Sequence, residues 1–386
     1  MSDGADFIQR ARDLAPMLDA AGDEIERRRE LPEHVVAALI DGGFFRMLQP
    51  KFLGGAELRP VLFTQVTEAL AQTNASVGWC IGQNNGCSTT AAYLDREVAC
   101  EIFGPPTGIL AWGPPGSPYQ AQPVDGGYRI SGKWRFASGC HHARWLGCHV
   151  TIAGTGKVRT LLFPKSSVEM HDIWHTIGLR GTGSKTIILN DVFIPEYRTV
   201  SVLDILNGDS PGREVNTHPM YGGSTDANFT GAMSVPAIGS AKGLIEMFHQ
   251  RLGSKIEIPD STNSPYMPEG MSITMGRLSQ AAATIDAGRA LMLVNAQSFA
   301  ERPAKEVTLA DTMRMKRDTA WCAQQARRAV NVLYEESGGS ALSERSPLQQ
   351  FWRDTNAAAA HRGLMFDWQA EGWVKAVLGL PVPLPF

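Results

Sequence analysis

The chain has 386 residues, of which 43% are hydrophobic and 19% charged, with a formal net charge of −3 and a pI of about 6.3. This composition is typical of a globular enzyme with more than one domain, and its slightly acidic balance argues against a nucleic-acid partner. The polar opening MSDGADFIQR and the amide-rich uncharged run 69–94 predict neither a secretory signal nor a membrane span. Six cysteines without a CxxC spacing indicate free thiols in a reducing cytoplasm.

Helical patterns fill the first hundred residues. Apolar residues recur at helical spacing between Leu14 and Ile25, and Pro32 suits the first turn of the next helix. A Gly- and Pro-rich loop at 48–58 separates this region from two further helices expected over about 60–103. We assign residues 1–107 to an N-terminal helical domain.

The pattern changes near residue 108. The stretch 125–145, DGGYRISGKWRFASGCHHARW, begins with a Gly-Gly turn and continues with the alternation that marks β-structure. It runs into Ala137, Ser138 and Gly139, small residues beside which a flat ligand can lie close to the backbone. Further alternating segments place a middle β-domain at 108–206.

Residues 207–386 form the third region. A polar linker is expected at 207–230, and helical patterns return from Ala232, interrupted by a Pro-, Ser- and Asn-rich loop at 259–268. The stretches 271–300 and 310–337 are rich in good helix formers and exceed an average globular helix, as expected for a bundle. The predicted fold class is therefore α+β, mostly α.

The stretch 125–145 resembles the middle domain of the acyl-CoA dehydrogenase superfamily. Its ending, FASGCHHARW, is similar to the oxygenase components of two-component flavin-dependent monooxygenases, the group D aromatic hydroxylases of that superfamily. The resemblance covers nearly the whole chain. It implies an N-terminal helical domain, a middle β-barrel-like domain and a C-terminal four-helix bundle through which four copies assemble as a homotetramer.

The segment RDTNAAAAHRG, residues 353–363, bears on the chemistry. In many dehydrogenases of the superfamily a similar segment ends Tyr-Glu-Gly, and its Glu removes a substrate proton. Here His361 and Arg362 take those two places. A guanidinium cannot act as the base, whereas a histidine can exchange protons near neutral pH. The resemblance to the monooxygenases implies that His361 is a catalytic base beside the flavin; the alternative is a core histidine.

The resemblance also places residues beside the flavin ring. Ser138 matches a serine near flavin N5 that would support a C4a-hydroperoxide, although a strand-end hydroxyl is the alternative. The run GLRGTGSK, 178–185, fails the phosphate-loop pattern because Ser, not Lys, follows its last glycine. It resembles instead a loop of the related flavoproteins that lies near the cofactor or the substrate. Trp112, in the Pro/Gly loop 111–118, is a further expected wall. The complete set expected at the ring is Trp112, Trp134, Phe136, Ser138, Gly183 and Ser184.

Other assignments follow from the resemblance more loosely. Arg251 resembles a phosphate-binding arginine region, the alternative being an ordinary surface arginine, and Gly338 and Gly339 resemble a loop that meets the cofactor across a subunit contact. The residues expected around the substrate are Trp79, Gln83, Asn84, Cys87 and Arg362, the last as a partner for a substrate carboxylate. Several hydroxylases have a histidine near the position of Cys87 that this chain lacks, so phenolic, indolic and aryl-acid substrates all stay open.

Histidines elsewhere receive no firm role. His141 and His142 are adjacent, so at most one can face a pocket if they lie on a strand. His171 and His175 are four apart, but their region reads as strand and loop, so no metal site is expected.

Together these features imply an oxygenase that uses reduced FMN or FAD and O2 to hydroxylate a small aromatic compound. Because the chain lacks a GxGxxG fingerprint, a separate NAD(P)H-dependent reductase would supply the reduced flavin. Neither the flavin, the reductase nor the atom that receives oxygen is specified by the sequence. The alternatives are an acyl-CoA dehydrogenase with a displaced base and a non-catalytic flavin-binding protein.

Overall fold

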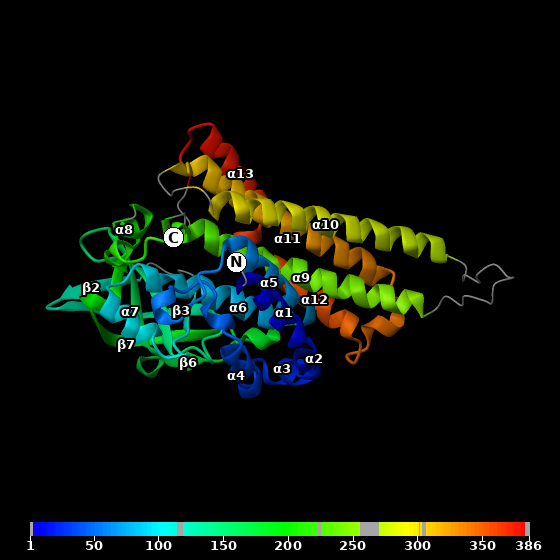
Figure 1. The fold of residues 1–386 in the computed structure, drawn as a ribbon, viewed down its shortest axis with the longest axis horizontal. Helices are drawn as coiled ribbons and strands as arrows, with labels where there is room; N and C mark the ends of the chain where they lie inside the picture. The colour runs from blue at the N-terminus through cyan, green and yellow to red at the C-terminus, as the bar shows by residue number, and fades with distance from the viewer. Residues whose placement is uncertain are drawn as a thin grey trace.

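The computed structural model describes residues 3–113, 119–207, 209–222, 225–254, 270–300, 302 and 306–382. Strands gather at one end of the molecule, and long helices run side by side toward the other (Figure 1). This arrangement confirms the predicted α+β, mostly α fold. The predicted loop 259–268 and most of the loop 111–118 lie outside the described residues.

The N-terminal part is helical, with bounds α1 (Asp3–Asp13), α2 (Ala15–Ala20), α3 (Gly22–Arg28), α4 (Glu33–Asp41), α5 (Pro60–Thr73), α6 (Ala75–Ser88) and α7 (Arg96–Phe103). Three helices, not two, therefore occupy 60–103. Asn74 separates α5 from α6 because its backbone is extended and its side chain accepts hydrogen bonds from the N–H groups of Ser76 and Val77. The uncharged run forms the end of α5 and all of α6.

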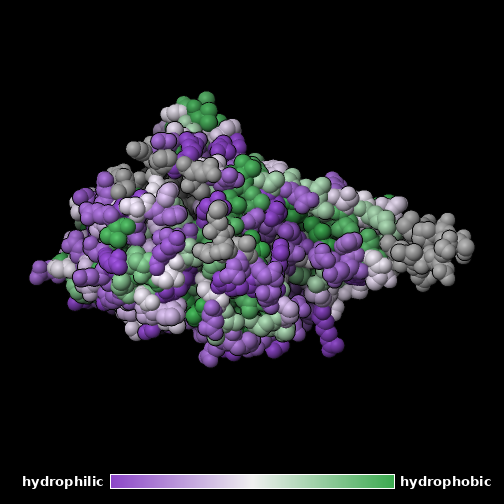
Figure 2. Space-filling view, viewed as in Figure 1, coloured by the Kyte–Doolittle hydropathy of each residue, from purple (hydrophilic) through white to green (hydrophobic). Residues whose placement is uncertain are grey.

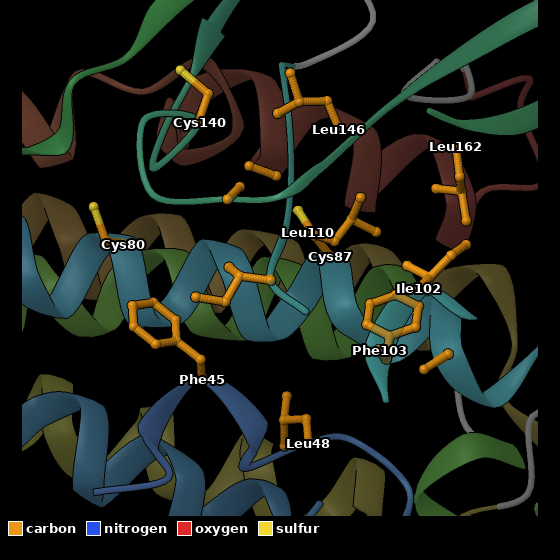
Figure 3. Packing of buried hydrophobic residues seen from close by; sticks show 14 of the residues in the cluster. Phe45, Leu48, Cys80, Cys87, Ile102, Phe103, Leu110, Cys140, Leu146 and Leu162 are labelled. Atoms are coloured by element: carbon orange, nitrogen blue, oxygen red, sulfur yellow. The ribbon is translucent and has the colours of Figure 1, made fainter. Parts of the chain in front are cut away.

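Helix α6 is buried on almost every side. Phe45 and Leu48 pack on one side of it, and Leu110 and Leu146 of the strand region lie on the other (Figure 3). Small and apolar side chains along α6 permit this close packing. The helix thereby links the N-terminal helices to the sheet.

The β-structure comprises β1 (Leu110–Trp112), β2 (Gln120–Val124), β3 (Gly127–Ala137), β4 (Trp145–Ile152), β5 (Val158–Pro164), β6 (Glu169–His171), β7 (Lys185–Pro195) and β8 (Thr199–Ser201). The strand order is β6-β7-β3-β2-β4-β5-β8, with β1 beside β4. Strand β2 pairs antiparallel with β3 and parallel with β4, so it joins the two halves of the sheet. Strand β3 pairs antiparallel with β7.

A bulge ends β3 and corrects one prediction. The pairing slips between Trp134 and Ala137, and Phe136 there has a φ of +62°. Regular alternation would place Trp134 and Phe136 on one face. Instead Trp134 is 1% exposed in the core beside Tyr119, whereas Phe136 is 49% exposed. Trp134 is therefore packed in the core, which gives no support to its expected place at a wall of the flavin site.

The C-terminal part comprises α8 (Val202–Asn207), α9 (Thr225–Gly253), α10 (Met271–Ala300), α11 (Leu309–Glu335), α12 (Pro347–Ala359) and α13 (Phe366–Val377). Helix α9 begins within the predicted linker and packs against α5, α10, α11 and α12. The buried Glu68 of α5 pairs with Lys242 of α9 and Arg289 of α10 at 2.7 Å each, which ties the N-terminal helices to the bundle.

The surface differs between the two ends. Hydrophobic residues show along the bundle, whereas the sheet end is mostly hydrophilic (Figure 2). Exposed apolar side chains of the bundle include Val294, Trp368, Val374, Val377 and Leu378. Within the described ranges, no helix has the length and apolar character needed to cross a membrane.

Candidate active site

Three segments distant in sequence meet at Trp79, on α6. Its indole N–H donates to the Ser138 hydroxyl, just after β3, at 3.0 Å. The centroid of its ring lies 5.7 Å from that of His361, just after α12. Trp79 and Ser138 are buried, and His361 is half-buried. The structure thus brings together the two predicted catalytic residues and one residue predicted to line the substrate cavity.

Ser138 belongs to a chain of hydroxyl groups. Its Oγ lies 2.8 Å from Ser184 Oγ, which lies 2.7 Å from Thr182 Oγ1. Thr182 donates to the carbonyl of Leu179 at 2.8 Å. An indole N–H can only donate and a carbonyl can only accept, so the donor and the acceptor of each hydrogen bond between these hydroxyl groups are determined. Ser138 accepts from Trp79 and donates to Ser184, and Ser184 donates to Thr182.

The loop that carries Ser184 is held by close packing. A side chain added at Gly181 would lie 2.1 Å from Ile25 Cγ2, so only glycine fits between α3 and α6. Gly178 approaches the carbonyl of Arg353 in the same way, at 2.4 Å from an ideal Cβ position. Gly183 has a φ of +52°, which favours glycine. The glycines of this run thus serve backbone packing around Ser184.

Asp354 is a functional candidate that sequence reasoning missed. Its carboxylate accepts from the N–H of Leu179 at 2.6 Å and is buried. Burial, reinforced by the nearby Glu26, raises the pKa of Asp354 to about 7. Its neighbour Arg353 pairs with Glu26 at 2.9 Å. In the sequence, Arg353 and Asp354 served only to align the segment 353–363 with the similar segment of the dehydrogenases.

His361 begins a short 3-10 turn, η11 (Arg362–Leu364), and its Nδ1 accepts from the N–H of Gly363 at 3.0 Å. Burial lowers the pKa of His361 to about 4, so the ring is neutral at pH 7. Arg362 points elsewhere: its guanidinium stacks on exposed Trp368 of α13, 4.6 Å from the ring centroid. This stacking gives no support to the predicted carboxylate-binding role of Arg362.

The other residues predicted around the substrate divide into two groups. Gln83 lies one turn beyond Trp79 on α6 and is half-buried. Asn84 is fully buried and structural, because it donates to the Leu110 carbonyl at 3.0 Å and contacts His142 Nε2 at 2.9 Å. Cys87 is also fully buried, and burial raises the pKa of its thiol far above the ordinary value.

The adjacent histidines lie in a turn, not on a strand, and neither contacts Ser138. His142 is packed against Phe45, and burial lowers its pKa to about 3. His141 faces Glu30 at 3.1 Å, and Lys185 pairs with the same carboxylate at 3.1 Å. Among residues with a described position, no group of three His, Cys, Asp or Glu side chains could hold a metal ion.

Aromatic side chains lie beside the hydroxyl chain and on β1. Phe136 lies 6.0 Å from Trp174, centroid to centroid, and its positive φ turns it out of the core. Trp112 lies on β1, half-buried, in an edge contact with His149 at 4.9 Å. The exposed Phe136 ring, the buried Ser138 hydroxyl and the neutral His361 ring combine an apolar face with polar groups, and this combination fits a flat aromatic group such as a flavin ring.

Arg251, Gly338 and Gly339 lie together, but away from Ser138. Arg251 donates to the Ser337 carbonyl at 3.2 Å and to Ser340 Oγ at 2.6 Å, beside the two glycines. Met233 of α9 lies near Gly363, beside His361. At the usual helical rise, Arg251 lies about 27 Å further along α9 than Met233. Arg251 therefore lies too far along the bundle to contact a flavin ring beside Ser138 of the same copy.

Comparison with known proteins agrees with this architecture. The family described as "Acyl-CoA dehydrogenase, N-terminal domain" matches residues 6–96, and "Acyl-CoA dehydrogenase, C-terminal domain" matches 232–366. The chain is 31% identical to the flavin-dependent monooxygenase oxygenase subunit HsaA of Rhodococcus jostii, covering 92% of this chain and 93% of that protein. It is 28% identical to the FADH(2)-dependent resorcinol hydroxylase oxygenase component of Rhizobium sp., covering 97% and 94%. The crystal structure of the HsaA monooxygenase from M. tuberculosis superposes with a TM-score of 0.90 at 28% identity, covering 99% of each chain.

Proposed function

Because the chain belongs to the flavin-dependent monooxygenase oxygenase components of the acyl-CoA dehydrogenase superfamily, we propose that Ser138, Trp79 and His361 form its reaction site. The protein is the oxygenase component of a two-component system, which uses reduced flavin and O2 to hydroxylate a small aromatic compound. When bound, reduced flavin activates O2 and supplies one oxygen atom to the substrate.

The observation that carries the site proposal is the double contact of Trp79, with Ser138 on one side and His361 on the other. Burial excludes water from Ser138, which an oxygenase needs in order to avoid releasing peroxide. The hydroxyl chain fixes Ser138 at the edge of the site. Phe136 offers an apolar face, and His361 lies beside the Trp79 ring.

The finer assignments are part of the same proposal. FADH2 is the favoured flavin, since the resorcinol hydroxylase with 28% identity is described as FADH(2)-dependent. The relatives are described as oxygenase subunits or components, which supports a separate reductase. The exposed apolar residues of the bundle support a homotetramer, in which Arg251 and Gly338–Gly339 of one copy would meet the flavin phosphates of another. We also propose that the protein is located in the cytoplasm.

The test is aerobic turnover with a flavin reductase, NADH, FAD or FMN, and a panel of phenols, indoles and aryl acids. Hydroxylated product and hydrogen peroxide are both measured. We expect product with the wild type, and a larger peroxide fraction with Ser138→Ala because that substitution removes the buried hydroxyl that links Trp79 to Ser184. The matched control is Ser88→Ala, which removes an unpartnered buried hydroxyl from the far end of α6.

Wild-type protein that consumes NADH but oxygenates no member of the panel would contradict the assignment. Bleaching of bound flavin by an acyl-CoA under anaerobic conditions would point to the dehydrogenase alternative. Equal peroxide fractions in Ser138→Ala and Ser88→Ala would remove Ser138 from the proposed site.

A further inference from the structure

Leu179 has a rare backbone conformation at the start of the loop that carries Thr182 and Ser184. Its φ of +51° and ψ of +33° lie in the left-handed region, which few residues other than glycine adopt. Its side chain is buried, and its backbone N–H and carbonyl are both hydrogen-bonded. Such a conformation persists only where the surrounding contacts hold it. The contacts of Leu179 therefore determine the course of the loop.

The carbonyl of Leu179 is the last acceptor of the hydroxyl chain. It accepts from Thr182 Oγ1 at 2.8 Å, from the N–H of Thr182 at 3.1 Å and from the indole N–H of Trp174 at 2.9 Å. Thr182 in turn contacts Ser184, which contacts Ser138. A change in the backbone angles of Leu179 would turn this carbonyl away and leave the Thr182 hydroxyl without its acceptor. The direction of the chain thus depends on the orientation of Leu179.

The N–H of Leu179 is held by a side chain of α12. It donates to Asp354 Oδ1 at 2.6 Å, and Asp354 is 2% exposed. The preceding Gly178 packs on the backbone of α12, because its ideal Cβ position lies 2.4 Å from the carbonyl oxygen of Arg353. The guanidinium of Arg353 donates to the carbonyl of Ile177. Helix α12 therefore contacts three consecutive residues of the loop, and Asp354 holds the one with the left-handed backbone.

The same helix leads to His361. Helix α12 ends two residues before His361, and Asp354 lies within its last two turns. Leu179 belongs to the same buried hydrophobic cluster as Trp79 and Ala358. The bond between Asp354 and Leu179 therefore connects the helix that precedes His361 to the loop that holds the hydroxyl chain. Trp79 contacts the two sides of this connection, through Ser138 and His361.

We propose that Asp354 is a positioning residue of the reaction site: by holding Leu179 in its left-handed conformation, it fixes the hydroxyl chain that ends at Ser138 relative to α12. This inference rests on the proposed function, in which Ser138 and His361 belong to one site. Asp354 acts through the backbone of Leu179 and is not a catalytic residue. Loss of the bond would loosen the buried surroundings of Ser138, so that more O2 is released as peroxide and less oxygen reaches the substrate.

Asparagine is the conservative replacement for Asp354. Burial, followed by the charge of Glu26, raises the pKa of Asp354 to about 7. The N–H of Leu179 and the cations Arg353 and Arg180 act in the opposite direction. A substantial fraction of the carboxyl group therefore carries a proton at neutral pH, and a neutral amide resembles this form. Asp354→Asn keeps an oxygen that can accept from Leu179, whereas Asp354→Ala removes it.

Amide hydrogen exchange tests the anchoring of the loop without flavin or substrate. Exchange is measured by mass spectrometry in the full chain, for the peptide that spans 174–184. We expect exchange about 5- to 30-fold faster in Asp354→Ala, the factor for losing one buried hydrogen bond, and wild-type exchange in Asp354→Asn. Asp354→Leu, which is branched like a carboxylate but has no acceptor, replaces the alanine variant if that variant does not fold. Unchanged exchange in the variant without an acceptor overturns the proposal.

Asp318 of α11 provides a matched control. It is 4% exposed, and its side-chain hydrogen bonds are with Arg314, Arg317 and Asn295 of the bundle. Asp318→Ala should destabilise the bundle while leaving exchange in 174–184 at the wild-type level. The reaction is followed as product formed per NADH consumed, with reductase and FAD present. We expect this ratio to fall in Asp354→Ala, with hydrogen peroxide making up the difference, and to be kept in Asp354→Asn and Asp318→Ala.

Three results of the reaction assay overturn the proposal. An equal fall of the ratio in Asp354→Ala and Asp318→Ala would assign the loss to general destabilisation. Faster exchange with an unchanged ratio would show that the loop does not affect the reaction, and a ratio as low in Asp354→Asn as in Asp354→Ala would exclude the acceptor role. Failure of the proposed function is distinguishable: wild type that oxygenates nothing rejects the oxygenase, and the exchange data still decide whether Asp354 holds the loop.

Discussion

Two buried serines allow the hydroxyl chain to be tested by a matched pair of substitutions. Ser184 is 1% exposed and makes two hydrogen bonds, to Ser138 and Thr182. Ser88 is 0% exposed and its hydroxyl has no partner among the described residues. Replacing either by alanine removes the same atom from an equally buried position. The two variants therefore differ only in the hydrogen bonds lost.

The expected changes in the free energy of unfolding follow from the hydrogen bonds that each serine makes. In Ser184→Ala two neutral hydrogen bonds are lost, each with a net value of about 1 kcal/mol, and the Ser138 proton is left without its acceptor. We expect the free energy of unfolding to fall by about 2 kcal/mol. In Ser88→Ala an unpaired buried hydroxyl is removed, so we expect no loss and up to about 1 kcal/mol of gain.

The assay is urea unfolding followed by tryptophan fluorescence, with wild type and both variants compared at the same protein concentration. A lower midpoint at unchanged slope reports a change in stability. Equal midpoints for Ser184→Ala and Ser88→Ala would refute the directed hydroxyl chain. Thr182→Val is a further check, because it removes the last donor of the chain and should destabilise in the same direction.

Other substitutions test the surroundings of the site. Gly181→Ala should destabilise by about 1 to 3 kcal/mol, since its Cβ would meet Ile25; an unchanged melting temperature would show that α3 can move aside. The pKa of Asp354 is raised from 3.8 to about 7, so the folded state keeps a proton that the unfolded chain has released, and stability falls as pH rises across that window. Asp354→Asn should therefore flatten the pH dependence of the melting temperature between pH 4 and 7; a steeper profile would contradict the sign. Arg362→Ala should leave the Michaelis constant for an aryl acid unchanged, because Arg362 stacks on Trp368; a large increase would restore its predicted binding role.

The sequence by itself determined the kind of fold and suggested the residues of the proposed site. Alternation at 127–137 and long runs of helix formers at 271–300 are local signals, because each depends on residues a few positions apart. His361 and Ser138 were identifiable because their residue types and flanking residues resemble known flavoproteins. Their proximity across α6 was implied by that resemblance and by nothing local.

Only the tertiary structure decided which side chains face the site. The bulge before Ala137 separates Trp134 from Phe136, and it arises from pairing with β7, about fifty residues away in the chain. Asn84 was expected at the substrate, but contacts with Leu110 and His142 commit it to the core. Such contacts are set by packing between distant segments and by turn geometry, neither of which appears in a periodic pattern.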